Sequence, residues 1–300
     1  MKTINYIVIV LQSIFFLSAC SNEQTIGDNE GKVPLEISVV GGSERAVIGG
    51  NTLPSRSYFG IYGVSDKMED GITADIQNLS VYYEGTCRLA KKVLLDDETI
   101  SLKAYYPYST NSKDGIVSIN ILDQVDFLYG KSVDSKGNLG YVNRRFPKAT
   151  IAFKHALSCL TFKMKHTSEY GEDFVLNCIS FAQLHASAQF DVFAQKLILG
   201  ELDELSFPVD VLVTKEYVSF SLLVMPTEGS EFFPESMTLR KSTFEEYQVE
   251  LPKGVWKAGQ EYTYEIVFGD AETDVSNTNI RLWKPVTELE MEVTDNDIAN

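Results

Sequence analysis

Histidine, cysteine and carboxylate groups most often hold metals or carry acid–base chemistry, and here they form no catalytic pattern. The histidines His155, His166 and His185 lie in unrelated local contexts. The sequence has neither the HExxH zinc motif nor the GxSxG nucleophile motif, and the stretch 27–32 is one residue short of a phosphate-binding loop. An acidic run after residue 65 has Met68 where a calcium loop needs an oxygen ligand. The residues therefore predict no enzyme, no metal site and no cofactor.

The first cysteine predicts a modification instead. Residues 1–19 carry Lys2, a short apolar run and the small pair Ser18-Ala19 directly before Cys20, which is typical of an export signal. The string Leu17-Ser-Ala-Cys20 resembles the bacterial lipobox, and this resemblance implies that Cys20 becomes an acylated first residue. We expect a lipoprotein signal peptide over 1–19 and a flexible polar tether over 20–32. The alternative is an ordinary secretory signal that is cut nearby.

Three further thiols, Cys87, Cys159 and Cys178, follow in the chain. An exported protein can form disulfides, but an odd number leaves at least one thiol free or paired between chains. We expect these cysteines to be buried thiols.

Composition excludes some partners. The 300 residues include 26 Lys and Arg against 42 Asp and Glu, so the formal charge is −16. A nucleic acid backbone would be repelled by such a chain, so no nucleic acid partner is expected. A hydrophobic content of 44% with 11% aromatic residues indicates a chain that folds around a core.

The elements that must position any site are strands. Apolar and polar residues alternate with period two in five segments, and turn residues separate them. These segments are 33–39, 211–214, 218–222, 247–251 and 262–268. No segment carries a helical stripe over three turns, and a change of phase near Cys159 predicts a bulge in one long strand over 153–166. The pattern predicts an all-β fold.

The length and one polar run predict two tandem β-sandwiches. The run 166–173 is the best candidate boundary, because it is polar and contains a glycine. We therefore expect an N-terminal sandwich over 33–168 and a C-terminal sandwich over 169–269. Residues 270–300 are expected to form a linker and a C-terminal tail.

Several strings in a fixed order resemble the fimbrillin-like family. They are 103–108 (KAYYPY), 126–129 (DFLY), 153–158 (FKHALS) with 160–165 (LTFKMK), 223–226 (LVMP) and 254–264 (GVWKAGQEYTY). The lipobox and the pair Arg45-Ala46 ahead of Phe59 extend the resemblance over most of the chain. One departure is Thr227, where the family commonly has glutamine after the proline.

The resemblance implies a lipoprotein precursor with two transthyretin-like sandwiches, carried to the outer membrane and built into type V fimbriae. It further implies that a trypsin-like protease cuts after an early arginine and that a strand of the next subunit fills the emptied groove. Arg45-Ala46 is the matching bond, and Arg56-Ser57 is a second, less well placed candidate. The implied partners are other fimbrial subunits, of the same or another kind, the outer membrane, the protease, and host or bacterial surface receptors.

Two segments have the alternation that such an exchange needs. Val33, Leu35, Ile37 and Val39 share one parity upstream of Arg45 and form the candidate exchangeable first strand. In the tail, the apolar residues of the candidate donor strand alternate with glutamates; they are Leu289, Met291 and Val293. The simpler alternative is that each segment is an ordinary strand of its own domain.

The leading functional hypothesis is a structural subunit, of shaft or accessory type, that assembles by proteolytically triggered strand exchange and supports adhesion and biofilm formation. The alternative is a surface lipoprotein that binds a glycan or host ligand and never polymerises. Exposed rings at Tyr105, Tyr106 and Tyr108 would supply its stacking surface, although this spacing is also typical of core residues of a strand.

Overall fold

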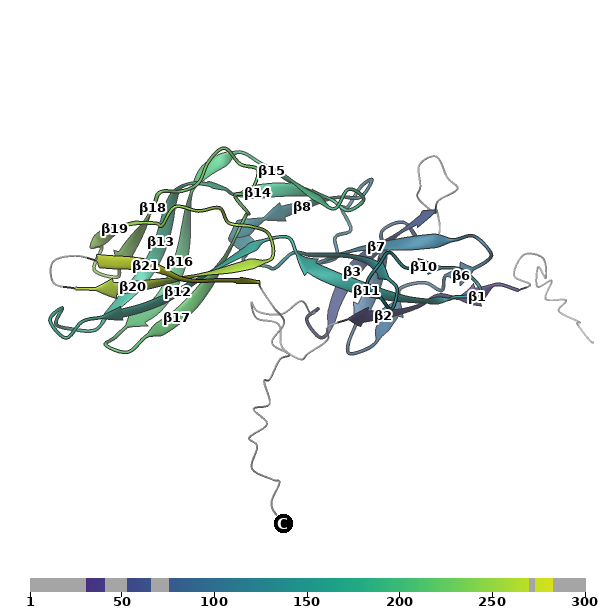
Figure 1. The fold of residues 1–300 in the computed structure, drawn as a ribbon, viewed down its shortest axis with the longest axis horizontal. Coiled ribbons are helices and arrows are strands. Elements are labelled where there is room, and N and C mark those ends of the chain that lie inside the picture. Colours follow the sequence, from purple (N-terminus) through teal and green to yellow (C-terminus); the bar gives the residue numbers. More distant parts are fainter. Residues whose placement is uncertain (1–30, 41–52, 66–75, 270–272, 283–300) are drawn as a thin grey trace, which may run out of the picture.

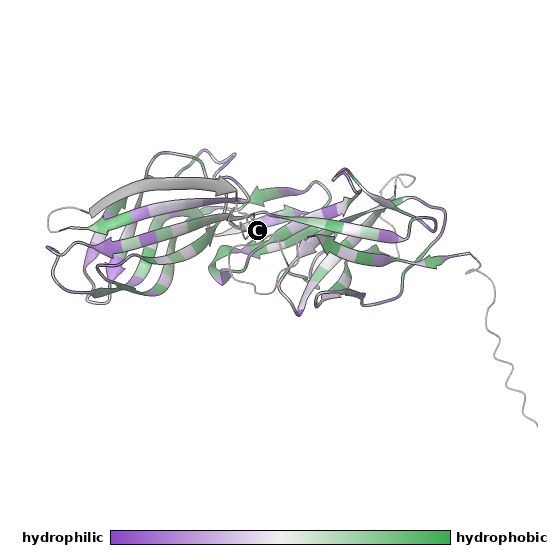
Figure 2. Cartoon of the chain, turned by 60° about the horizontal axis from the view of Figure 1, so that its bottom comes forward, coloured by the Kyte–Doolittle hydropathy of each residue, from purple (hydrophilic) through white to green (hydrophobic). Residues whose placement is uncertain are grey.

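The computed structural model describes residues 31–40, 53–65, 76–269 and 273–282, and these are mostly strand (Figure 1). The prediction of an all-β fold is confirmed. Strand arrows carry alternating hydrophobic and hydrophilic bands in Figure 2, as expected of strands with one face on a core. The described strands form two groups that follow one another along the long axis of the molecule in Figure 1.

The first group is an eight-stranded sheet. Its strands in spatial order are β2 (Glu36–Val40), β11 (Lys148–His155), β9 (Leu128–Val133), β7 (Ile100–Tyr106), β3 (Ser57–Ser65), β4 (Leu79–Tyr83) and β5 (Cys87–Leu89), and β10 (Tyr141–Val142) pairs with β7 outside this path. A separate two-stranded ribbon joins β1 (Val33–Pro34) to β6 (Leu94–Leu95). All neighbours are antiparallel except β2 and β11, which run parallel. One buried cluster belongs to this sheet and includes Phe59, Leu102, Ile151 and Phe153.

The second group contains two four-stranded sheets. One has the order β17 (Val218–Val224), β12 (Ser158–His166), β20 (Gln260–Phe268), β21 (Thr273–Leu282). The other has the order β16 (Leu202–Val213), β13 (Phe174–His185), β18 (Ser236–Lys241), β19 (Glu246–Glu250). Both sheets contribute side chains to one second buried cluster, among them Phe162, Ile179 and Tyr264. This arrangement is a β-sandwich.

A third sheet connects the two groups. It consists of β15 (Lys196–Leu199), β14 (Ser187–Asp191) and β8 (Ile116–Asn120), so a strand from early in the chain pairs with two later strands. A short 3₁₀ helix, η2 (Ile121–Asp123), follows β8. Val117, Phe127, and the rings of Tyr62 and Tyr105 all belong to the second buried cluster. The two groups therefore share packed aromatic residues.

Sheet membership changes earlier along the chain than the predicted boundary between residues 168 and 169. β11 ends at His155 in the first group, and β12 begins at Ser158 with partners β17 and β20 in the second. The predicted single bulged strand over 153–166 is thus two strands in different sheets, separated by Ala156 and Leu157. Both connecting residues are buried apolar residues, so composition gives no sign of a boundary there. The division into two independent domains stays a prediction.

The signature tryptophan of the fimbrillin-like strings is buried and anchored. The Trp256 indole donates to the Tyr264 hydroxyl at 2.8 Å, and the Trp256 backbone N–H donates to the Thr227 hydroxyl at 2.8 Å. Thr227 N–H donates in turn to the Trp256 carbonyl. The residue that departs from the family pattern therefore has a structural role, since its side chain fixes the loop before β20.

Candidate functional site

The candidate exchangeable strand lies at one edge of the first sheet. Leu35 is 5% exposed and belongs to the core of that sheet, and Ile37 and Val39 are half-buried against the same cluster. Val33 lies in β1 opposite Leu95. The inward parity read from these residues thus corresponds to their burial, while their exchange with another strand stays a prediction.

Among the described strands, β2 has one sheet neighbour, β11. It pairs in parallel with β11 from Glu36 opposite Lys148 to Val40 opposite Ala152. On the solvent face, the Lys148 Nζ lies 3.2 Å from the Glu36 carboxylate, and the hydroxyls of Ser38 and Thr150 are 3.1 Å apart. The ion pair is exposed and contributes little, so β2 is held chiefly by one row of backbone hydrogen bonds and by Leu35.

A groove of about 430 Å³ lies between the two terminal strands of this sheet, β2 and β5. One wall is formed by Leu35 and by β2 as far as Val39, and the other is formed by Tyr83, by the turn after β4 and by Cys87 and Leu89 of β5. Because β2 and β5 are both terminal strands of the sheet, the groove lies between two sheet edges. Sheet edges are the positions at which proteins accept an additional strand.

Cys87 is one of the residues that line this groove. Its side chain is half-buried against the core of the first sheet, and burial raises the pKa of the thiol to about 11. Cys159 and Cys178 are buried, and all three are free thiols. Burial likewise raises the pKa of Cys159 to about 12. The expectation of buried thiols is confirmed for Cys159 and Cys178, whereas Cys87 is only partly covered.

Several predicted site residues lie outside the described residues. These are Cys20, Arg45, Ala46, Leu289, Met291 and Val293. The second cleavage candidate, Arg56, is described. It is exposed in a turn with φ of 61°, and its Nε donates to the Glu84 carboxylate at 2.8 Å. Ser57, the next residue, is the first residue of β3, which pairs on both sides.

Sequence reasoning missed two histidine–carboxylate pairs, because they depend on chain reversal. His155 Nδ1 lies 2.8 Å from the Asp126 carboxylate, and His166 Nε2 lies 2.9 Å from that of Asp173. Both rings are buried. Among the described residues, no group of three or more His, Cys, Asp or Glu side chains is arranged to hold a metal ion. Over the same part of the chain, no helix has the length and apolar character needed to cross a membrane.

Of the three tyrosines in the alternative hypothesis, Tyr105 has no exposed ring to offer as a stacking surface. Tyr105 is fully buried, and its hydroxyl donates to the Asn78 side chain at 2.6 Å. Gly60 leaves room for its ring, because a Cβ atom there would lie 2.3 Å from the Tyr105 ring. Tyr106 and Tyr108 are half-buried. The core interpretation of this spacing is therefore the right one for Tyr105.

Fold and groove together define an all-β, sandwich-containing protein with an edge strand held on one side. The chain belongs to the fimbrillin-like family, whose model matches residues 45–283. The resemblance read from the ordered strings is thereby confirmed.

Solved structures support the same fold. A candidate cell adhesion protein from Bacteroides ovatus has a TM-score of 0.63 at 20% identity, over 84% of this chain and 98% of that one. Another from Bacteroides uniformis has a TM-score of 0.61 at 17% identity, over 85% and 100%. A fimbrial protein from Bacteroides vulgatus has a TM-score of 0.57 at 14% identity, over 84% and 99%. No curated protein matches the chain.

Proposed function

We propose that this protein is a structural subunit of type V fimbriae, of shaft or accessory type, that assembles by strand exchange and supports adhesion and biofilm formation. The observation that carries the proposal is the state of β2. Among the described strands it has a single sheet neighbour, it follows directly on the buried Leu35, and it borders a groove between two sheet edges. Family membership supports a fimbrial role.

In this proposal the chain is a lipoprotein precursor of the outer membrane. Acylation at Cys20 tethers it, and a trypsin-like protease then cuts between Arg45 and Ala46. The cut separates β1 and β2 from the rest of the sheet, since both precede it in the chain. Removal of β2 would free the edge of β11 and unite it with the groove that β5 borders. The tail strand of a neighbour, with Leu289, Met291 and Val293 inward, would then occupy the freed edge.

The bond after Arg56 is a poorer cleavage site for the protease than the bond after Arg45. A protease must bind several extended residues on each side of the cut, and those after Arg56 are the paired residues of β3. Peeling β3 from β4 and β7 would disrupt the middle of the sheet. Arg45 is therefore the better cleavage position in this proposal.

The test is to incubate the purified precursor with a trypsin-like protease. We expect a shortened chain that begins at Ala46, together with SDS-resistant ladders. Arg45→Ala should abolish both products, and the matched variant Arg56→Ala should abolish neither. A chain that is cut cleanly at Arg45 and remains monomeric at high concentration would contradict assembly by strand exchange.

A further inference from the structure

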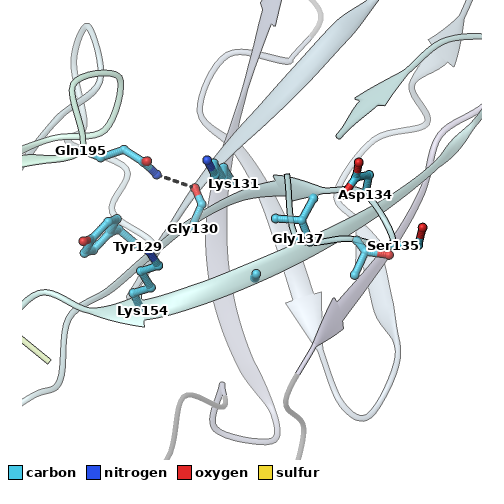
Figure 3. Close-up of a pocket in the computed structure, with 11 residues that line it drawn as sticks. Tyr129, Gly130, Lys131, Asp134, Ser135, Gly137, Lys154 and Gln195 are labelled. Atoms are coloured by element: carbon cyan, nitrogen blue, oxygen red, sulfur yellow. Dashed lines mark hydrogen bonds between the residues drawn. The ribbon is translucent and has the colours of Figure 1, made fainter. Parts of the chain in front are cut away.

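A second concave site lies on the opposite, solvent-facing side of the first sheet. It is a groove of about 650 Å³ over the middle of β9 and β11 (Figure 3). Its floor is made of the outward residues Tyr129, Lys131, Thr150, Ala152 and Lys154, and one wall is Gln195 from the turn between β14 and β15. The Gln195 amide donates to the Gly130 carbonyl at 3.2 Å, which attaches this turn to β9.

Two lysines, Lys131 and Lys154, line this groove, and a third, Lys103, lies beside Lys131 on the same face of the sheet. Lys103 of β7 lies directly opposite Lys131 of β9, and Lys154 of β11 is diagonal to Lys131, because Lys131 is opposite Ala152. Such positions place the side chains within about 5–8 Å of one another at Cβ. Burial and the neighbouring charge of Lys131 both lower the pKa of Lys103. The ammonium groups of Lys103 and Lys131 therefore repel each other on this face of the sheet.

Within the described part of the chain, no ion pair joins Lys103, Lys131 or Lys154 to a carboxylate. The ion pairs found there involve other lysines, such as Lys148 with Glu36 and Lys241 with Glu245. This is notable in a chain with 42 acidic residues and a net charge of −16. Like charges placed opposite one another destabilise a sheet. An anionic ligand would remove that cost on binding.

The two ends of the groove differ in chemistry. Figure 3 shows Lys154, Tyr129 and Gln195 at one end and Asp134 and Ser135 at the other. Asp134 accepts backbone N–H groups of its own turn at 2.8 Å, and those bonds, that of Asn138 first, lower the pKa of its carboxyl. Burial raises the pKa of the Tyr129 hydroxyl at the lysine end. One end thus offers positive charge, and the other offers acceptors and a hydroxyl.

We infer that this groove binds an acidic saccharide, with its carboxylate or sulfate at the lysines and its hydroxyl groups toward Asp134 and Ser135. A peptide strand fits the site less well, because β9 already pairs with β7 and β11, and β11 pairs with β9 and β2. Recognition must therefore come from side chains, which suits a small polyhydroxylated anion. This inference does not depend on strand exchange, so it can fail or succeed separately from the assembly proposal.

The test measures binding of four probes to the purified full chain by titration calorimetry. The probes are digalacturonate, a sulfated chondroitin disaccharide, neutral lactose and a glutamate-rich peptide. We expect both acidic disaccharides to bind at least about tenfold more tightly than lactose, since one charge-assisted hydrogen bond is worth that much. Added salt should weaken the binding of the acidic probes.

The variants decide which surface binds. The double variant Lys131→Gln, Lys154→Gln should weaken binding of the acidic disaccharides by about tenfold or more, whereas the matched control Lys163→Gln should change it by less than about twofold. Lys163 is an exposed strand lysine of the second group, on β12. Unchanged thermal unfolding of the double variant shows that its fold is intact. Equal binding of lactose, equal loss in the control, or equally tight binding of the peptide would overturn the inference.

Discussion

Removing the first two strands should make the thiol of Cys87 reactive. Cys87 and β2 line the same groove, and burial holds the pKa of this thiol at about 11. We compare the chain that begins at Ala46, and therefore lacks β1 and β2, with the precursor that begins at Cys20. Loss of β2 should expose Cys87 and return its pKa toward the ordinary value of 9.0.

The magnitude follows from the thiolate fraction. At pH 7.5 a fall in pKa from about 11 to 9.0 raises this fraction roughly 100-fold. A thiolate of lower pKa is also a weaker nucleophile, which reduces the gain in rate to about 10-fold before any gain in access. The sign is fixed, because burial disfavours the charged thiolate and exposure removes that effect.

The assay is reaction with an aromatic disulfide reagent, followed by mass spectrometry of the peptides that carry each cysteine. Cys159 and Cys178 are internal controls, since both are buried outside the groove in strands of the second group. We expect faster reaction at Cys87 alone. An unchanged rate at Cys87 would refute the covering role of β2, and equal acceleration at all three thiols would show general unfolding instead.

Three further predictions concern stability. Leu35→Ala should lower the free energy of unfolding by about 2–3 kcal/mol, because Leu35 is buried in the core. Amide hydrogen exchange should become faster in β2 first, and an equal increase in β3 and β7 would contradict the separate release of that edge. Lys241→Ala should lower the free energy of unfolding by about 2 kcal/mol, because the Nζ lies 4.5–5.0 Å from the centres of three aromatic rings and 2.8 Å from the Glu245 carboxylate. Urea denaturation should therefore show a lower midpoint, and an unchanged midpoint would show that these contacts are energetically neutral. Burial raises the pKa of Tyr105 and of Tyr264 to about 12. The free energy of unfolding should therefore be unaffected by the ionisation of these groups below pH 10 and fall between pH 10 and 12, because the unfolded chain releases the two protons first. Alkaline titration followed by circular dichroism measures this fall, and a flat stability curve over that range would contradict the prediction.

Local alternation determined much of this protein. The inward parity of Leu35 and Ile37 and the strand over 262–268 could be read directly, because a half-buried strand repeats every two residues. The cysteine count and the spacing of Tyr105 likewise pointed to burial. The ordered strings were sufficient to identify the family.

Long-range pairing was decided only by the tertiary structure. The parallel contact of Glu36 with Lys148 joins residues far apart in the chain, and no local pattern specifies such a partner. The chain passes from one sheet to the other at Ala156 and Leu157, which are buried apolar residues. The polar run after His166, in contrast, connects β12 to β13 within the same group. The groove over β9 and β11 arises for the same reason, since Lys131 and Lys154 come from two strands whose register sets their neighbours. Sequence specifies which face of a strand is buried, but the pairing of strands decides which side chains meet.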